Sequence, residues 1–255
     1  MPLQSLVLPA YAKINLDLRI IGVRPDGFHS LRTVFQSLSL HDVLTFTLQK
    51  GPFAIECDDP TLPTDRRNLI WKAASLLWRT VGRRRGETPR DVTVGLRKRV
   101  PVLAGLGGAS ADAAATLLAL SRLWELDVDL PTLSRLASRL GADVPFFLVG
   151  GTALGLGRGD DIYPLTDLPR TYVVVVRPKF GVSTVEAYGW YDDEPKRTTR
   201  RAGSVARMVL EPAERPGASR DSPSPDHRQN QARARRRWRG RGGDVGVRIG
   251  GFRPV

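Results

Sequence analysis

The amino-acid sequence predicts an α+β fold whose N-terminal part is rich in strands. Three observations support this prediction. Apolar and polar residues alternate in several segments before residue 100, apolar residues recur at helical spacing in two segments, and a glycine-rich loop joins an alternating segment to an alanine-rich one. With 255 residues, of which 41% are hydrophobic, the chain is long enough for one large domain or two smaller ones.

The alternating segments come first along the chain. Residues 6–22, LVLPAYAKINLDLRIIG, predict a pair of strands, and residues 39–49 and 53–57 predict one strand each. Residues 68–82, NLIWKAASLLWRTVG, predict a helix, because their apolar residues share one helical face and Asp65 and Asn68 precede them.

The following segments mix strands and helices. Val92, Val94 and Leu96 predict a strand within residues 91–101 that leads into the glycine-rich loop. Helices are predicted over residues 110–123 and 130–141, the second of them ending at Gly141. Residues 171–180, TYVVVVRPKF, predict a buried strand that starts a second structural unit.

The glycine-rich loop has the layout of an anion site. Pro101, Gly105, Gly107 and Gly108 stand between a predicted strand and a helix that begins at Ser110. Glycines let backbone N–H groups approach phosphate oxygens closely, and a helix N-terminus attracts negative charge. The pattern is neither a P-loop nor a strict dinucleotide fingerprint, so by itself it also fits an ordinary turn.

The cysteine content and the apolar runs limit the class of protein. The single cysteine, Cys57, excludes an internal disulfide and a cysteine-based metal cluster, and we interpret it as a small buried or half-buried apolar residue. No apolar run approaches the roughly 18 residues of a membrane span, and the N-terminus lacks the features of a secretion signal. We therefore expect a cytoplasmic protein that has no membrane partner.

The net charge of +13 is concentrated in the last part of the chain. Residues 1–195 contain 23 basic and 21 acidic residues, whereas residues 196–255 contain 16 basic and 5 acidic residues. That segment is rich in Arg, Gly, Pro and Ser, a composition typical of disorder. A basic arm that binds RNA or another polyanion is one interpretation; a single Trp without interleaved aromatic residues argues against a nucleic-acid partner.

Three motifs in order and spacing carry a family resemblance over about residues 8–192. Residues 9–42, PAYAKINLDLRIIGVRPDGFHSLRTVFQSLSLHD, together with PVLAGLGGASADAA and GADVPFFLVGGTALGLGRGD, closely resemble the 4-diphosphocytidyl-2-C-methyl-D-erythritol kinases of the GHMP kinase superfamily. The resemblance implies a two-domain fold. Residues 1–155 would form an ATP-binding domain like domain 2 of ribosomal protein S5, and residues 156–194 would start a ferredoxin-like C-terminal domain that is incomplete here.

The resemblance also implies the reaction and its residues. The enzyme would transfer phosphate from ATP, with Mg²⁺, to the 2-hydroxyl of a cytidine-diphosphate alcohol in the non-mevalonate isoprenoid pathway, as a monomer or a homodimer. Lys13 and Asp143 would be catalytic, Asn15, Phe28 and His29 would bind the cytidine end, and Ser110 would lie near Mg²⁺ or a phosphate oxygen. Tyr188 and Trp190 would wall the same pocket or belong to the core. The residues expected to bind ATP are Pro101, Val102, Leu103, Ala104, Gly105, Leu106, Gly107, Gly108, Ala109, Ser110 and Ala111.

The end of the chain departs from the family pattern. Members carry an NDLE-like segment and a late MSGSG-like motif, and neither occurs here. Codons permitted for residues 244–255, read one base out of frame, translate as MSGSGSAVFGL, and the same offset from residue 214 yields a string beginning NDLEPPV. We therefore interpret residues 195–255 as an out-of-frame, disordered tail, the frame being lost between about Asp193 and Glu214 by a mutation or a sequencing error, and expect impaired activity.

Two other functions compete with this interpretation. A different GHMP kinase, acting on mevalonate or homoserine, would keep the fold and change the acceptor, but the segment PDGFHSL argues against it. The other is a non-enzymatic polyanion binder that uses the basic tail, whose affinity would fall steeply with salt.

Overall fold

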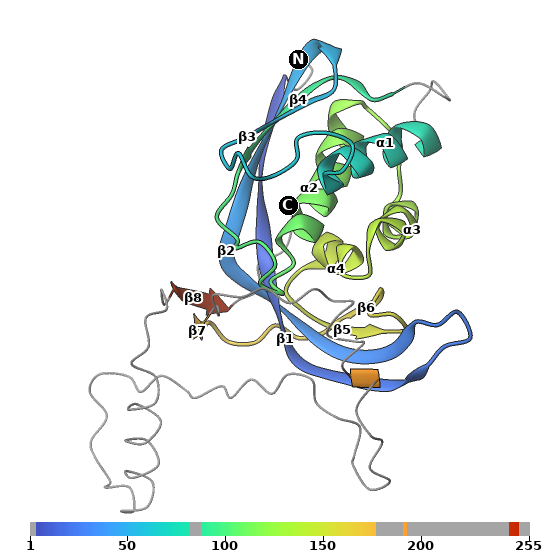
Figure 1. Cartoon of the computed structure of the whole chain (residues 1–255), viewed down its shortest axis with the longest axis vertical. Helices are drawn as coiled ribbons and strands as arrows, with labels where there is room; N and C mark the ends of the chain where they lie inside the picture. Colours follow the sequence, from blue (N-terminus) through green and yellow to red (C-terminus); the bar gives the residue numbers. More distant parts are fainter. Residues whose placement is uncertain (1–3, 82–87, 177–190, 193–244, 250–255) are drawn as a thin grey trace, which may run out of the picture.

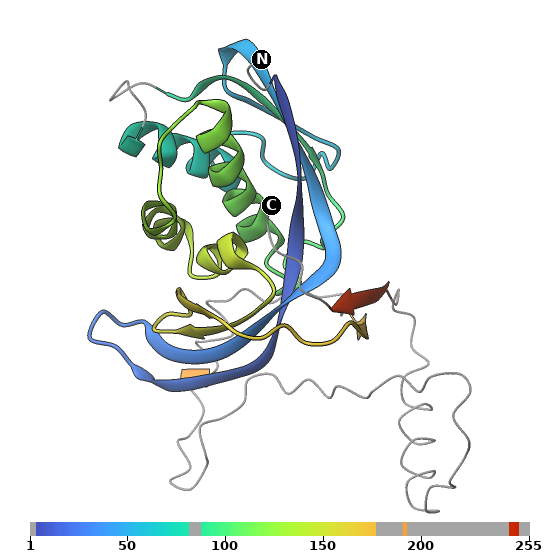
Figure 2. The same ribbon diagram turned by 180° about the vertical axis from the view of Figure 1, so that it is seen from behind.

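A computed structural model describes residues 4–81, 88–176, 191–192 and 245–249 of the chain. Two long antiparallel strands, β1 (Ser5–Val23) and β2 (His29–Pro52), run through the molecule, and four helices pack on one face of the sheet that they form (Figure 1). The view from behind shows the same layering, with the helices on one side of these strands (Figure 2). The predicted α+β class is confirmed.

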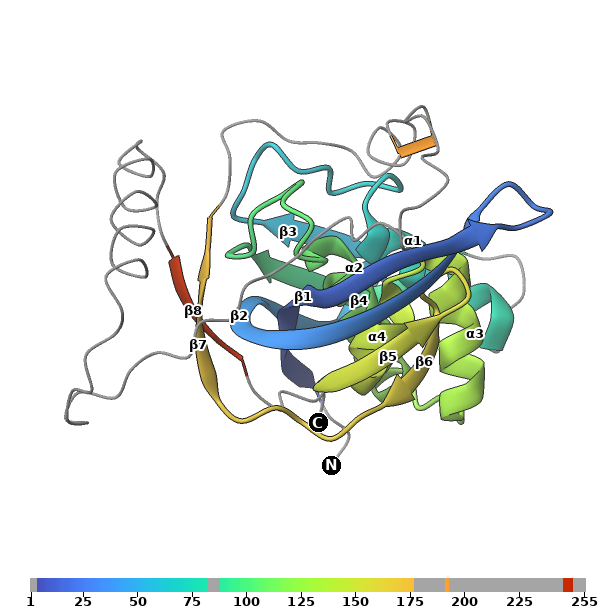
Figure 3. The same cartoon turned by 90° about the horizontal axis from the view of Figure 1, so that it is seen from below.

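Strand β2 is the centre of the sheet, because different parts of it pair with different neighbours. Along one edge it pairs with β1, and along the other it pairs first with β5 (Thr152–Leu156) and then with β4 (Arg90–Arg97). Strand β3 (Ala54–Cys57) extends the sheet beside β4, and β6 (Asp161–Pro164) extends it beside β5. Figure 3 shows β5 and β6 beneath one end of the long β2 strand.

The helices form the second layer. They are α1 (Leu69–Val81), α2 (Gly108–Leu123), α3 (Leu130–Leu140) and the short α4 (Val144–Val149). Phe35 and Phe46 of the sheet share one hydrophobic core with Leu77 of α1, Leu120 of α2 and Phe146 of α4. Helix α2 is buried along most of its length, which explains its many alanines: small side chains let the five elements around it, α1, α3, α4, β1 and β2, approach its backbone.

The local helix signals predicted two of these helices well. Asn68 accepts a hydrogen bond at Oδ1 from the backbone N–H of Ile70, and Asp129 accepts one from Thr132, so each caps its helix as expected of these residue types. Gly141 ends α3, as predicted. Helix α2 begins two residues earlier than predicted, at Gly108, because Gly107 takes the left-handed conformation and serves as its N-cap.

The prediction of a strand pair over residues 6–22 is wrong, since this segment is the single strand β1. It contains no turn; instead the register with β2 shifts between Tyr11 and Lys13, between Asn15 and Asp17, and between Ile20 and Gly22. Such bulges bend a strand and move the side chains that follow to the other face of the sheet. They therefore interrupt the alternation of apolar and polar residues within the one strand, and the segment resembles two strands in the sequence. The sequence patterns also did not predict β5, β6 and α4.

The prediction for residues 171–180 is correct in type and wrong in burial over residues 171–175, and residues 177–180 lie outside the described residues. Residues 171–175 form strand β7 (Thr171–Val175), but only Val173 is buried, while the side chains of Tyr172 and Val174 are 61% and 65% exposed. The three valines of the strand, Val173, Val174 and Val175, thus alternate between the two faces of a half-covered strand.

The basic segment is described only at residues 245–249. These residues form strand β8 (Val245–Ile249), which pairs with β7 and meets β2 at Leu38, so the prediction that residues 195–255 have no consistent packing is wrong for them. The rest of that segment lies outside the described residues, and the predicted domain limits at residues 155 and 194 stay predictions. Cys57 is half-buried, as predicted. In the described ranges, no helix combines the length and apolar character required to cross a membrane.

Candidate functional site

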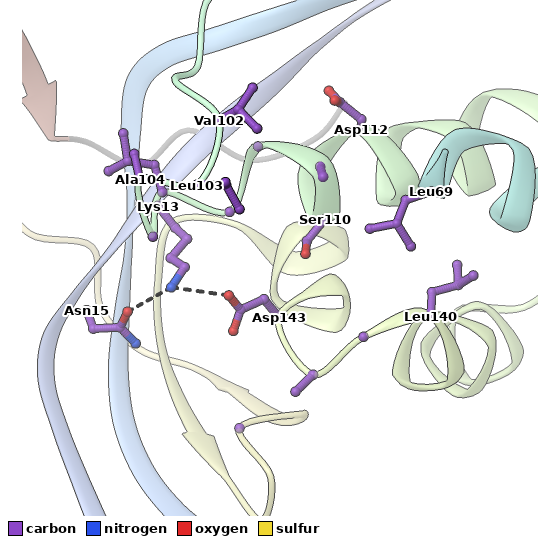
Figure 4. Close-up of a pocket in the computed structure, with 18 of the residues that line it drawn as sticks. Lys13, Asn15, Leu69, Val102, Leu103, Ala104, Ser110, Asp112, Leu140 and Asp143 are labelled. Carbon is purple, nitrogen blue, oxygen red and sulfur yellow. Dashed lines mark hydrogen bonds and ion pairs between the residues drawn. The ribbon is translucent and has the colours of Figure 1, made fainter. Parts of the chain in front are cut away.

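Two residues far apart in the sequence meet at the centre of a cavity. Lys13 of β1 and Asp143, which directly precedes α4, form an ion pair with 3.2 Å between Nζ and Oδ2 (Figure 4). The lysine side chain is only 7% exposed, whereas that of Asp143 is 37% exposed. Asp143 occupies the N-cap position of α4 but makes no capping hydrogen bond with its side chain. Its carboxylate is therefore directed to the lysine and the cavity rather than to its own helix.

A chain of hydrogen bonds orients the lysine. Lys13 Nζ donates to Asn15 Oδ1 at 2.8 Å, Asn15 Nδ2 donates to Thr33 Oγ1 at 2.7 Å, and Thr33 Oγ1 donates to the carbonyl of Asp17 at 2.7 Å. The ammonium also lies 5.5 Å from the centroid of the Phe35 ring. Because a buried ammonium needs partners, these contacts hold Nζ in one place.

The glycine-rich loop, residues 101–108, closes one side of the cavity and is joined to the lysine through the backbone. The N–H of Lys13 donates to the carbonyl of Leu106 at 2.9 Å. Gly107 has φ of 73°, and a Cβ built there would lie 2.6 Å from Cζ of Phe147. Gly105 also has a positive φ, 70°, but no atom lies within 4 Å of the corresponding position. The loop thus needs glycine for close packing at one point and for backbone conformation at the other.

Helix α2 starts from this loop with its N-terminus at the cavity. The first N–H that bonds back to the loop is that of Ala111, which donates to the carbonyl of Gly107 at 2.9 Å. The preceding N–H groups of a helix have no intrahelical partner, and the first turn of α2 carries no acidic residue. The end of the helix therefore presents partial positive charge to whatever occupies the cavity.

Nearly all the residues predicted to bind ATP line the cavity, namely Pro101, Val102, Leu103, Ala104, Gly105, Leu106, Gly107, Gly108, Ala109 and Ser110. The exception is Ala111, which is buried in the hydrophobic core behind the loop. It lies one step around the helix, on the face that packs against the sheet and the other helices.

A buried charged network supports the loop from behind, and the sequence patterns did not point to it. Asp42 of β2 accepts hydrogen bonds at Oδ1 from the backbone N–H groups of Arg99 (2.6 Å) and Val100 (2.8 Å). Lys98 Nζ bridges Asp42 Oδ2 and, at 3.1 Å, Asp112 Oδ2 of α2. Burial would lower the pKa of Lys98, but the two carboxylates outweigh it and raise that pKa.

The carboxylate of Asp112 is the charge in this network that its neighbours do not fully compensate. Burial raises the pKa of its carboxyl to about 7, because the attraction of Lys98 offsets only part of the desolvation and Asp42 adds repulsion. Its Oδ1 is buried and has no hydrogen-bond partner within the described residues. A proton on this oxygen at neutral pH would remove the uncompensated charge.

The predicted acceptor residues Phe28 and His29 line the same cavity at its other end. The Phe28 side chain belongs to the β1–β2 turn and is 56% exposed, with the guanidinium carbon of Arg158 at 5.5 Å from its ring centroid. His29 Nε2 lies 2.8 Å from Asp192 Oδ1, and its ring meets that of Tyr191 edge to face. Asn15, predicted for the same end, lies instead beside Lys13. Tyr188 and Trp190 lie outside the described residues.

One cavity of about 1080 Å³ is lined by the glycine-rich loop, by Lys13 and Asp143, and by Phe28 and His29. This volume is in the range of pockets that hold whole small molecules. In the described ranges, no three His, Cys, Asp or Glu side chains are grouped as a metal site. Ser110 and Asp143 nevertheless face the same space (Figure 4), so a hydroxyl and a carboxylate oxygen could supplement phosphate oxygens around a hard cation.

The comparisons with known proteins agree on one family. The GHMP kinases N terminal domain matches residues 68–151. The chain is 43% identical over 204 residues to the 4-diphosphocytidyl-2-C-methyl-D-erythritol kinase of Moorella thermoacetica, covering 80% of this chain and 70% of that protein. With the enzyme of the same name from Pelotomaculum thermopropionicum it shares 46% identity over 180 residues, covering 70% of this chain and 61% of that protein.

The structural comparison gives the same result. A crystal structure of 4-(cytidine 5'-diphospho)-2C-methyl-D-erythritol kinase superposes with a TM-score of 0.66 at 30% sequence identity, covering 97% of this chain and all of that one. A mevalonate pyrophosphate decarboxylase from Streptococcus pyogenes superposes with a TM-score of 0.55 at 16% identity, which shows a shared fold alone.

Proposed function

The chain belongs to the 4-diphosphocytidyl-2-C-methyl-D-erythritol kinases among the GHMP kinases, and from this membership we propose that it phosphorylates the 2-hydroxyl of 4-diphosphocytidyl-2-C-methyl-D-erythritol with ATP. The observation that carries the proposal is the ion pair of Lys13 and Asp143 in a cavity that has the glycine-rich loop at one end and Phe28 at the other. The substrate would be a precursor in the non-mevalonate isoprenoid pathway.

Asp143 and Lys13 divide the chemistry between them. Asp143 is the more exposed partner, so the acceptor hydroxyl can reach its carboxylate and pass its proton to it as the new phosphate ester bond forms. Lys13 is buried and held by Asn15, so its ammonium stabilises negative charge on the transferring phosphoryl group.

The glycine-rich loop and the start of α2 would hold the ATP phosphates. Backbone N–H groups and the positive end of the helix suit an anion, and the absence of acidic side chains from the first turn avoids repulsion. Ser110 and phosphate oxygens would hold Mg²⁺, which neutralises phosphate charge when bound. The buried network of Asp42, Lys98 and Asp112 would keep the loop in its binding conformation.

Phe28 and His29 would bind the cytidine end of the acceptor. An exposed aromatic ring at a cavity wall can stack on a base, and stacking tolerates any base, so hydrogen bonds from His29 and nearby backbone must select cytosine. This aromatic end of the cavity favours a nucleotide-linked alcohol over a small acceptor such as mevalonate or homoserine. A cytoplasmic location and a monomeric or homodimeric state stay predictions, whereas the family membership supports the kinase function over polyanion binding by residues 196–255.

Substitution of the two central residues tests the proposal. In the chain with its reading frame restored after about residue 193, Lys13→Ala and Asp143→Asn should each lower kcat at least about a hundredfold while ATP affinity, measured by calorimetry, changes little, because both act on the transferring group. Matched substitutions of exposed residues, Lys50→Ala and Asp127→Asn, should leave kcat unchanged. A turnover near the parent value in either central variant would refute the assignment of that residue.

A further inference from the structure

We propose that Arg158 binds the diphosphate of the acceptor, a role that rests on the proposed function and adds a phosphate-binding residue to it. Arg158 lies in the turn between β5 and β6 and lines the same cavity as Lys13, Asp143 and Phe28. The acceptor needs such a residue, because two phosphates join its cytidine to the alcohol and carry negative charge into a partly closed site.

The position of Arg158 matches the middle of the acceptor. Its guanidinium carbon lies 5.5 Å from the centroid of the Phe28 ring, where the base would stack. On its other side, Nη2 donates to the carbonyl of Ser138 at 3.2 Å, in the last turns of α3, and Gly141 at the end of that helix leads directly to Asp143. Arg158 thus spans the region between the base end and the reacting end, which is where the diphosphate must pass.

The Arg158 guanidinium is held through one nitrogen, Nη2, and its other two nitrogens can donate hydrogen bonds to a ligand. Both hydrogen bonds of the side chain, to Ser138 and to Asp160 Oδ2, use Nη2. Within the described part of the chain, Nη1 and Nε of Arg158 make no hydrogen bond, and the side chain is 32% exposed. A guanidinium fixed at one corner, with its remaining donors unused on a residue that lines the cavity, suits two phosphate oxygens in the fork geometry that arginine favours.

The backbone of this turn is also anchored. The carbonyl of Gly157 accepts a hydrogen bond from the N–H of Leu31 in β2 at 2.6 Å, and the N–H of Gly159 donates to the carbonyl of Leu156 at 2.9 Å. Gly157 and Gly159 have φ values of 67° and 94°, which side chains rarely adopt, so the turn places Arg158 between two glycines. The arginine therefore extends from a fixed point rather than from a loosely held loop.

Most of the other cations that line the cavity are paired with acids, Arg67 with Asp65 among them, while Arg139 of α3 lines it with an exposed side chain. Lys13 pairs with Asp143, and Lys98 bridges Asp42 and Asp112 behind the glycine-rich loop. Asp160 pairs with Arg158 as well, so the net local charge is small before the substrate binds. Its carboxylate, however, engages only the nitrogen that also contacts Ser138, and so orients the guanidinium without covering its remaining donors.

Binding of CDP and cytidine, measured by calorimetry on the full chain, tests this role without requiring turnover. Arg158→Gln should weaken CDP binding about 10- to 100-fold and leave cytidine binding unchanged, because only CDP carries the diphosphate. Arg158→Lys, which keeps the charge and loses the fork, should give an intermediate loss. Arg170→Gln, at an exposed arginine outside the cavity, should change neither affinity.

The possible outcomes separate this inference from the proposed function. Unchanged cytidine binding by Arg158→Gln also shows that the variant is folded. If the parent prefers CDP over cytidine and both Arg158 variants keep that preference, the role of Arg158 is refuted while the proposed function stands. If the parent binds neither CDP nor cytidine, the acceptor assignment of the proposed function fails, and the role of Arg158 fails with it.

Discussion

Asp112→Asn should change how the stability of the protein depends on pH. Asp42, Lys98 and Asp112 form a buried cluster with two carboxylates and one ammonium, so one negative charge has no counterpart when both acids are ionised. Asparagine has nearly the same shape as aspartate and no charge, and Lys98 keeps Asp42 as its partner. The substitution therefore removes the uncompensated charge and little else.

The direction of the effect follows from the raised pKa of Asp112. In the unfolded chain this carboxyl loses its proton near the ordinary pKa of 3.8, whereas in the folded protein it keeps the proton up to a pKa of about 7. Between these values the folded state binds more protons, so the contribution of Asp112 to the free energy of unfolding falls as pH rises from 4 to 7. The difference between the two pKa values corresponds to at most about 4 kcal/mol, all of it lost above pH 7.

Urea unfolding followed by circular dichroism at pH 5, 6, 7 and 8 measures this effect. Relative to the parent, the Asp112→Asn variant should become progressively more stable as pH rises, and the difference should level off above pH 7. Asp127→Asn, which removes an exposed carboxylate, should run parallel to the parent. Equal pH slopes for the parent and the Asp112→Asn variant would refute the argument that a buried, partly protonated carboxyl lies behind the glycine-rich loop.

Three further predictions concern the loop, the acceptor end and the reading frame. Gly107→Ala should weaken ATP binding at least about tenfold, because its Cβ would lie 2.6 Å from Phe147 and its φ is positive. Gly105→Ala has the same backbone strain without that contact and should lose clearly less ATP affinity. Equal losses of ATP affinity in calorimetry would contradict the packing argument. Phe28→Ala should raise KM for the cytidine substrate far more than KM for ATP, and equal increases would remove Phe28 from the acceptor site. The chain as written should phosphorylate its substrate far more slowly than a version with the reading frame restored after about residue 193. Comparable rates of the two proteins in a coupled kinase assay would show that the frame interpretation is wrong or irrelevant.

Features set by neighbouring residues could be predicted from the sequence. Helices α1 and α3 followed from apolar spacing and from the boundary residues Asn68 and Gly141, because capping depends on backbone groups only a few residues away. The glycine-rich loop was recognisable for the same reason, since positive φ values and a helix start are local properties. The resemblance to a family then indicated that Lys13 and Asp143 act together, which no local pattern could show.

The supporting contacts depended on the tertiary structure, because they join residues that are distant in the chain. Lys98 and Asp42 are 56 residues apart, and in the sequence each resembles an ordinary solvated surface charge. Only the packing of α2 against β1 and β2 buries them with Asp112, and this burial makes the Asp112 carboxyl costly to ionise. Arg158 and Phe28 likewise meet because β5 pairs with β2 and brings the β5–β6 turn to the cavity. The sequence by itself thus determined α1, α2 and α3, the loop and the family, while the burial of charge and the position of the arginine were decided by how the long strands and helices pack.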